Sequence, residues 1–168
     1  MRVNFDIRKA SVEDVSVIRD MATVAFPHTY KDILSAEQIE YMMEWMYSTE
    51  SLARQMEQEG HIYYLAYCEG VPVGYLSVQP EDEDVYHLQK LYVVPSHQGL
   101  QLGKILFGHA IKVIKELHPM PCQMRLNVNR QNSALTFYEK MGMVKIAEGD
   151  FPIGNGYYMN DYIMGLEI

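Results

Sequence analysis

The chain has 168 residues, of which 48% are hydrophobic and 21% are charged, and its formal net charge is -8. This length fits one domain, taken as residues 1–168, and the composition is that of a folded globular protein rather than a disordered or collagen-like chain. The negative charge argues against binding to nucleic acid, whose phosphates are bound by clustered lysines and arginines, so we expect a neutral or cationic partner.

Hydrophobic spacing and turn residues predict strands and helices in a mixed order. Ser11 and Asp14 have the spacing of a capping box, so they predict the start of the first helix. The segment 26–31 interrupts that helical pattern, Ser35 is expected to cap the next helix, and Gly142 sits where a glycine ends a helix. The expected elements are a strand over 3–9, helices over 11–23, 35–46 and 51–59, strands over 61–68, 73–78 and 85–94, a helix over 101–116, a strand over 124–128, a helix over 133–141, and strands over 144–148 and 157–166.

This order of elements defines the expected fold class. Because hairpins and helical crossovers are mixed along the chain, we expect an α/β (α+β) fold in a single domain. Its sheet would be mixed and mostly antiparallel, with six to seven strands and helices on both faces. The sequence contains no internal repeat.

The cysteines and the apolar segments bear on location and metal binding. Cys68 and Cys122 lack the spacing of a zinc site, so we expect two reduced thiols and no metal. The first residues form no apolar leader, and no segment reaches the roughly 18 consecutive apolar residues of a membrane-spanning helix. We therefore expect a cytoplasmic protein with no membrane partner, and a homodimer remains open.

The stretch from Leu91 to Lys104 predicts a strand, a loop of small residues and the start of a helix. Such a junction directs free main-chain N–H groups and the positive end of a helix at one point, which suits a pyrophosphate. Gly99 and Gly103 let a ligand approach the main chain, although glycines at a helix start also serve tight packing. The stretch lacks the nucleotide P-loop ending and the G-x-G-x-x-G pattern, so the expected ligand is coenzyme A.

Two blocks of the chain resemble the GNAT superfamily of N-acetyltransferases. Gln98 and Gly103 match the cofactor loop Gln/Arg-x-x-Gly-x-Gly/Ala, in which Gln101 stands where the family has its middle glycine. Gln101 keeps the N–H donor of that position. The segment 127–143 is similar to the family's Asn-x-x-Ala-x-x-x-Tyr-x-x-x-Gly-Phe segment.

A narrower resemblance is to the bacterial polyamine or diamine acetyltransferase-like branch. It lies in Gln89-Lys90-Leu91-Tyr92-Val93 before the loop and in Asp161-Tyr162-Ile163-Met164 near the end of the chain.

The resemblance implies a V-shaped splay between the fourth and fifth strands, with the pantetheine arm of acetyl-CoA in the gap. The main chain of residues 91–93 would pair with that arm like an added strand. Asn132 would contact the arm from the other side, or would serve only as a helix cap. The candidate cofactor-binding residues are Leu91, Tyr92, Val93, Gln98, Gly99, Leu100, Gln101, Leu102, Gly103, Lys104, Asn127, Asn132, Tyr138 and Lys140.

Acetyl transfer to an amine needs a neutral amine, a polarised carbonyl and a proton for the leaving thiolate. The resemblance implies Tyr138 as the proton donor, with a plain core aromatic as the alternative. His87 stands where many relatives carry a carboxylate base, and a half-exposed strand histidine is its alternative. The N–H of Val93 is expected to polarise the carbonyl.

The acceptor pocket is expected to come from the N-terminal region and a late loop over residues 151–154. Aromatic residues there indicate an acceptor with apolar methylene groups. The candidate substrate-binding residues are Tyr30, Tyr41, Trp45 and Phe151.

The predicted function is an acetyl-CoA-dependent N-acetyltransferase that acts on a primary amine by direct attack in a ternary complex. The acceptor would be a small amine, a polyamine or a peptide amine. The alternative is a catalytically silent acyl-CoA-binding regulatory module, which Gln101 and the missing carboxylate at His87 favour. A purely structural interaction domain is a third possibility, since fold does not dictate function.

Overall fold

The computed structural model describes residues 3–168, which form a seven-stranded sheet and five α-helices. In chain order the elements are β1 (Asp6–Lys9), the 3-10 helix η1 (Val12–Asp14), α1 (Val15–Tyr30), α2 (Ala36–Tyr47), α3 (Thr49–Glu57), β2 (Ile62–Cys68), β3 (Val71–Asp82), β4 (Val85–Val93), the 3-10 helix η2 (Pro95–His97), α4 (Leu102–Leu117), β5 (Gln123–Asn129), α5 (Ala134–Lys140), β6 (Val144–Gly154) and β7 (Tyr157–Glu167).

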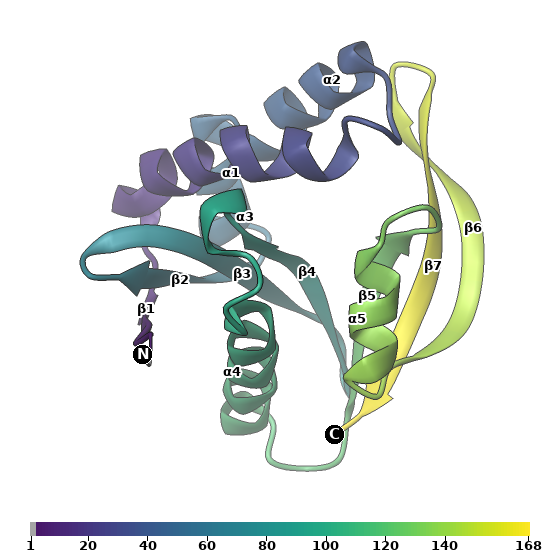
Figure 1. Ribbon diagram of the computed structural model, residues 1–168. Helices are drawn as coiled ribbons and strands as arrows, with labels where there is room; N and C mark the ends of the chain where they lie inside the picture. Colours follow the sequence, from purple (N-terminus) through teal and green to yellow (C-terminus); the bar gives the residue numbers. More distant parts are fainter. Residues whose placement is uncertain (1–2) are drawn as a thin grey trace.

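The sheet has the strand order β1-β2-β3-β4-β5-β7-β6, and every neighbouring pair is antiparallel except β4 and β5. The predicted mixed, mostly antiparallel sheet is therefore confirmed. β4 and β5 pair only over Val85–His87 and Gln123–Arg125. Just beyond, Gln89 is an extra residue of β4 against β3, and such a bulge bends a strand. The two halves of the sheet consequently diverge as a V, which confirms the predicted splay (Figure 1).

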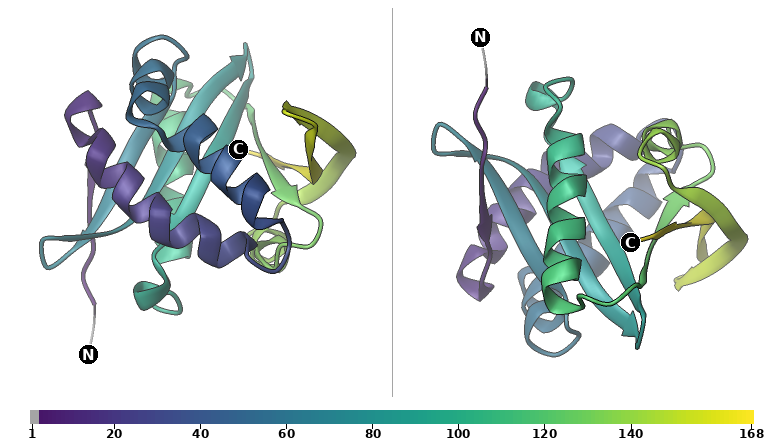
Figure 2. Two further views of the ribbon diagram at one scale, coloured as in Figure 1. Left: turned by 90° about the horizontal axis from the view of Figure 1, so that it is seen from above. Right: turned by 90° about the horizontal axis from the view of Figure 1, so that it is seen from below.

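Helices cover both faces of the sheet, as predicted. α1, α2 and α3 lie on one face of the β2–β4 half, and α4 lies on the other (Figure 2). One core cluster joins α4 and α5 to the strands, and it includes Leu106, Phe107, Leu126 and Tyr138. A second cluster lies under α1–α3 and is rich in tyrosine.

The first helical segment begins at the predicted cap, where the 3-10 helix η1 precedes α1, and it ends later than predicted. Ser11 N–H donates to the Asp14 carboxylate at 2.9 Å, which confirms the capping box. The expected break at residues 26–31 is wrong, because α1 continues through Pro27 to Tyr30. A proline inside a helix costs about 3 kcal/mol, whereas burial of an aromatic side chain stabilises by about 1.5–3 kcal/mol. Phe26 and Tyr30 are 1% and 5% exposed, so their combined burial offsets the proline.

Other boundaries differ from the expectation because pairing across the sheet sets the ends of the strands and a capping serine sets the start of α3. β1 begins at Asp6 rather than residue 3, and α3 begins at Thr49 after its cap Ser48. The expected late loop over 151–154 lies inside β6, where Phe151 pairs with Met159 of β7.

Candidate active site

A cleft of about 960 Å³ opens where β4 and β5 separate. Its walls come from the free half of β4, the start of α4, the end of β5, α5 and the last turn of α1. Val94 N–H donates to the Val73 oxygen at 2.9 Å, so alternation along β4 turns the main-chain groups of Leu91 and Val93 away from β3 and toward the gap. The Val93 oxygen accepts a hydrogen bond from Gln98 Nε2 at 3.1 Å. This edge suits an extended ligand that carries amide groups.

The loop before α4 presents unpaired main-chain donors. Within residues 3–168, the N–H groups from Gly99 to Lys104 meet no protein acceptor, and the first engaged donor of α4 is Ile105, which bonds the Gln101 oxygen at 3.1 Å. Gly99 and Gln101 both adopt left-handed conformations, with φ of 81° and 67°. A helix N-terminus with free donors is an anion site. The loop geometry therefore fits the pyrophosphate of coenzyme A.

Two exposed lysines line the same cleft from different elements. Lys104 lies in the first turn of α4, and Lys140 is the last residue of α5. Both carry positive charge in a chain whose net charge is -8. They give this part of the cleft a local positive potential that suits phosphate groups.

Tyr138 forms part of the cleft wall and is 8% exposed. Its ring lies against those of Phe107 and Phe137, with centroids 6.2 and 5.3 Å away. Burial raises the pKa of the Tyr138 phenol well above its ordinary value, and the nearby Tyr30 adds to this rise. The phenol is therefore protonated throughout the neutral range and can donate a proton, so its catalytic role stays a prediction with a suitable geometry.

His87 lies outside the cleft. The part of β4 that lines the cleft begins at Leu88, whereas His87 belongs to the segment that still pairs with β5, opposite Arg125. Its Nδ1 lies 3.2 Å from a carboxylate oxygen of Glu81. The geometry gives no support to His87 as the base that activates the amine.

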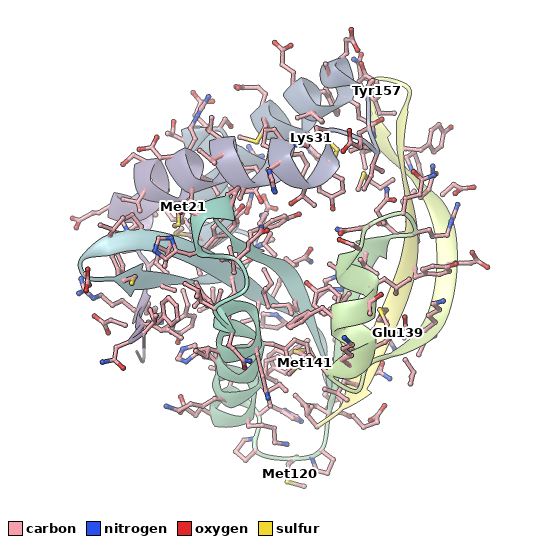
Figure 3. All side chains as sticks on the ribbon, viewed as in Figure 1. Met21, Lys31, Met120, Glu139, Met141 and Tyr157 are labelled. Atoms are coloured by element: carbon pink, nitrogen blue, oxygen red, sulfur yellow. The ribbon has the colours of Figure 1, made fainter. Side chains whose placement is uncertain are left out.

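The structure gathers most of the predicted cofactor-binding residues in one place. All of them except Leu100 line the cleft. Of the predicted substrate-binding residues, Tyr30 lines the cleft, whereas Tyr41, Trp45 and Phe151 do not. Tyr41 instead packs on Tyr157, with ring centroids 5.3 Å apart. Tyr157 lies at the tip of the β6–β7 hairpin (Figure 3).

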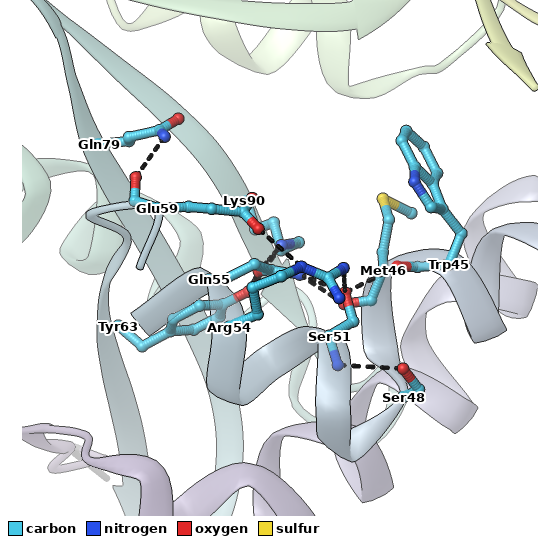
Figure 4. Close-up of polar contacts among 10 residues, drawn as sticks. All are labelled: Trp45, Met46, Ser48, Ser51, Arg54, Gln55, Glu59, Tyr63, Gln79 and Lys90. Carbon is cyan, nitrogen blue, oxygen red and sulfur yellow. Dashed lines mark hydrogen bonds and ion pairs between the residues drawn. The ribbon is translucent and has the colours of Figure 1, made fainter. Parts of the chain in front are cut away.

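Lys90 is a buried polar residue that the sequence interpretation missed. Its ammonium nitrogen, Nζ, donates to Gln55 Oε1 at 2.7 Å and to the Tyr63 hydroxyl at 2.6 Å, which ties β4 to α3 and β2 (Figure 4). Burial lowers the pKa of Lys90 to about 7, and Glu59 opposes this effect weakly. The sequence indicates a buried lysine of this kind only by its position next to apolar residues in a predicted strand.

Asp161 is the second buried group that was missed as a site residue. It lies in β7, opposite Asn129 of β5, and is 5% exposed. Like Lys90, it interrupts an apolar strand pattern, and the pattern alone does not indicate which face the carboxylate occupies.

Neither a metal centre nor a membrane-spanning helix is found in the part of the chain that the structure describes. Among residues 3–168, no three potential metal ligands gather at one point. No helix in that range combines the length and the hydropathy needed to cross a bilayer.

Comparisons with known proteins agree with this architecture. Residues 30–161 match the family described as the acetyltransferase (GNAT) domain. A spermidine N(1)-acetyltransferase of Thermoplasma acidophilum is 30% identical over 153 residues, which cover 88% of this chain and 92% of that protein. The crystal structure of the PaiA N-acetyltransferase of Thermoplasma acidophilum in complex with coenzyme A aligns with a TM-score of 0.79 and 26% identity, over 98% of this chain and 99% of that one. A GCN5-related N-acetyltransferase of Rhodopseudomonas palustris aligns with a TM-score of 0.81 over 100% of this chain and 99% of that one, and its 22% identity supports the fold alone.

Proposed function

The chain belongs to the GNAT acetyltransferase domain family, and from this premise we propose that it acetylates a small cationic amine of the polyamine class. It is an acetyl-CoA-dependent N-acetyltransferase, so the predicted reaction type and cofactor are confirmed. The acceptor class and the order of the reaction are our proposal.

One observation carries the proposal. The free donors from Gly99 to Lys104, the open edge of β4 and the phenol of Tyr138 share a single cleft with Tyr30, at the end of α1. Acetyl donor and amine acceptor can therefore meet beside Tyr138 without a covalent enzyme intermediate, which supports direct attack in a ternary complex.

The chain's own residues supply separate parts of this chemistry. Acetyl-CoA brings the acetyl group as an activated thioester. The loop amides and Lys104 would hold the phosphates, and the main chain of Leu91 and Val93 would bind the extended arm and polarise the acetyl carbonyl. Tyr138 would give its phenolic proton to the departing sulfur.

Two further observations support a polyamine acceptor. The net charge of -8 attracts a polycation to the protein. The relative from Thermoplasma acidophilum that is 30% identical over most of this chain bears the name spermidine N(1)-acetyltransferase.

The test is thiol release from acetyl-CoA with a panel of amines. The panel contains spermidine, spermine, a short diamine, a lysine peptide and a peptide with a free N-terminus. We expect the highest kcat/KM with a polyamine. Double-reciprocal plots of initial velocity, measured at several fixed concentrations of acetyl-CoA, should give intersecting lines. A preference for peptide amines would overturn the acceptor class, and parallel lines would overturn direct attack. Coenzyme binding without turnover across the panel would indicate a silent binding module instead.

A further inference from the structure

The carboxylate of Asp161 is buried, and only one of its two oxygens is hydrogen-bonded within the part of the chain that the structure describes. Its Oδ2 accepts a hydrogen bond from Asn127 Nδ2 at 3.3 Å. Its Oδ1 is buried and has no hydrogen-bond partner within residues 3–168. Leaving a buried acceptor unpaired costs about 1–3 kcal/mol, and more when the group is charged, so such an atom needs an explanation.

The nearest cation does not neutralise this carboxylate. Arg130 directs Nη2 to the Asp150 carboxylate at 2.6 Å and Nη1 to the Gly149 main-chain oxygen at 3.2 Å. It reaches Asp161 only at the main-chain oxygen, 3.5 Å away. Asp161 is therefore a buried carboxyl group whose side chain lacks a bonded counter-ion in the described chain.

Asp161 does not itself line the cleft, but it lies next to residues that do. Asn127, which donates to Asp161, lines the cleft, and so does Tyr30. Burial raises the pKa of the Tyr30 phenol, and the nearby Asp161 adds to this rise; burial likewise raises the pKa of Tyr138, and the nearby Tyr30 adds to it. Asp161 and the expected proton donor thus have Tyr30 as a common neighbour.

We propose that Asp161 is the catalytic residue that receives the acceptor: its free oxygen binds an N–H of the cationic amine and takes the proton that the amine must lose. This inference rests on the proposed function. In the step, the amine nitrogen forms a bond to the acetyl carbon and the carbon–sulfur bond breaks. The cationic amine loses two protons in all. Asp161 takes the first before the attack, and the second leaves the nitrogen of the adduct and restores the Tyr138 phenol, whose own proton has gone to the sulfur, so charge and atoms balance.

The chemistry of Asp161 suits this role better than that of the other candidate bases. Burial raises the pKa of Asp161, which makes the carboxylate a stronger proton acceptor than an exposed aspartate. His87 belongs to the segment of β4 that still pairs with β5, and its Nδ1 already lies 3.2 Å from a carboxylate oxygen of Glu81. Lys90 is already committed to Gln55 and Tyr63, and its charged form would repel a cationic acceptor.

The experiment compares Asp161→Asn with Asp150→Asn, a matched control. Asp150 lies on the neighbouring strand β6, is bonded to Arg130 and has a side chain that is 64% exposed, so its substitution removes the same charge outside the proposed site. Each protein is assayed with spermidine and with a primary arylamine that is neutral at pH 7. Calorimetry with coenzyme A reports on cofactor binding, and circular dichroism reports on folding.

We expect Asp161→Asn to lower kcat/KM for spermidine by about 100-fold or more, within the range for acid–base groups. The arylamine needs no counter-ion and has no ammonium proton to lose before attack, so kcat/KM of Asp161→Asn with this amine should stay within about threefold of the wild type. The kcat/KM of Asp150→Asn should stay within the same range with both amines. Coenzyme A affinity should change by less than about twofold, since the carboxylate does not line the phosphate loop. If Asp161→Asn does not fold, Asp161→Glu takes its place, and a loss of about tenfold confined to spermidine is expected.

The outcomes separate the two proposals. An Asp161 variant that keeps the wild-type rate with spermidine, or that loses both acceptors equally, overturns the role of Asp161 and leaves the proposed function standing. A wild-type protein that acetylates no cationic amine overturns the proposed function, and the inference falls with it.

Discussion

The hydroxyl of Tyr41 donates a hydrogen bond of 2.8 Å to the main-chain oxygen of Ile153, although the two residues are 112 positions apart. A second bond, from Gln38 Nε2 to the Tyr158 oxygen at 2.9 Å, joins α2 to β7, the other strand of the same hairpin. These contacts tie α2 to the β6–β7 hairpin at the open end of the V. They hold α2 and the hairpin together, and none of the four residues lines the cleft.

Gly154→Ala tests this tie. Gly154 has a φ of 97°, and an added Cβ would overlap the Tyr41 hydroxyl. We expect the free energy of unfolding to fall by about 2 kcal/mol more than in the control Gly156→Ala, because overpacking costs about 1–3 kcal/mol. Gly156 has a similar φ of 80° and no neighbour within 4 Å of the added atom. Equal losses in urea denaturation would show that the contact with Tyr41 contributes nothing.

Tyr138→Phe tests the proton donor. Removal of the hydroxyl should lower kcat for acetyl transfer by about tenfold or more, because the thiolate then leaves without a proton from the enzyme. Coenzyme A affinity should stay nearly constant. Tyr86→Phe is the control, since Tyr86 is also 8% exposed in the same core and lies outside the cleft. Equal rates for Tyr138→Phe and the wild type in the thiol-release assay would remove the phenol from the mechanism.

Gln101→Gly tests the strain in the phosphate loop. A left-handed conformation costs a non-glycine residue about 1–2 kcal/mol, and glycine avoids this cost. Glycine also makes the unfolded chain more flexible, which lowers the free energy of unfolding by about 0.5–1 kcal/mol and cancels part of the gain. We expect a net gain of about 0.5–1 kcal/mol in the free energy of unfolding. Gln101→Ala keeps the conformational demand at φ 67° and should be neutral. A gain in both variants would mean that the side chain, rather than the main-chain conformation, is unfavourable.

Lys90→Met tests the buried lysine through pH. An unfolded lysine keeps its proton to about pH 10.4, whereas folded Lys90 loses it at about 7. The unfolded state binds more protons between these values, so wild-type stability should rise with pH by as much as about 1.36 kcal/mol per unit across that window.

Lys90→Met should be more stable than the wild type at pH 7, and the difference should shrink toward pH 10. Lys104→Met, at an exposed position, is the control and should leave the pH slope unchanged. Parallel stability curves for the wild type and Lys90→Met between pH 7 and 10 would contradict the lowered pKa.

Local signals account for the parts of the fold that the sequence predicted. The Ser11 capping box and the glycine at Gly142, with a φ of 99°, depend on neighbouring residues alone, and both were found as expected. The errors depend on distant partners. Pro27 is tolerated because Phe26 and Tyr30 pack against other elements, and residues 151–154 are a strand because β7 pairs with them.

The same division applies to the site. The loop from Gln98 to Lys104 is contiguous, so its position at the cleft followed from the sequence. Asp161 and Lys90 escaped notice because their burial is created by strands and helices far along the chain. The role of His87 rested on the family resemblance, which does not reveal that β4 still pairs with β5 at that point.

The short contact between β4 and β5 has a thermodynamic consequence. Only three residue pairs of β4 and β5 join the two halves of the sheet, so the ladder hydrogen bonds between the halves are few. A coenzyme lodged along the unpaired edge would cross-link both halves, so melting temperature should climb with coenzyme concentration. Acetyl-CoA would then stabilise the folded protein in addition to supplying the acetyl group.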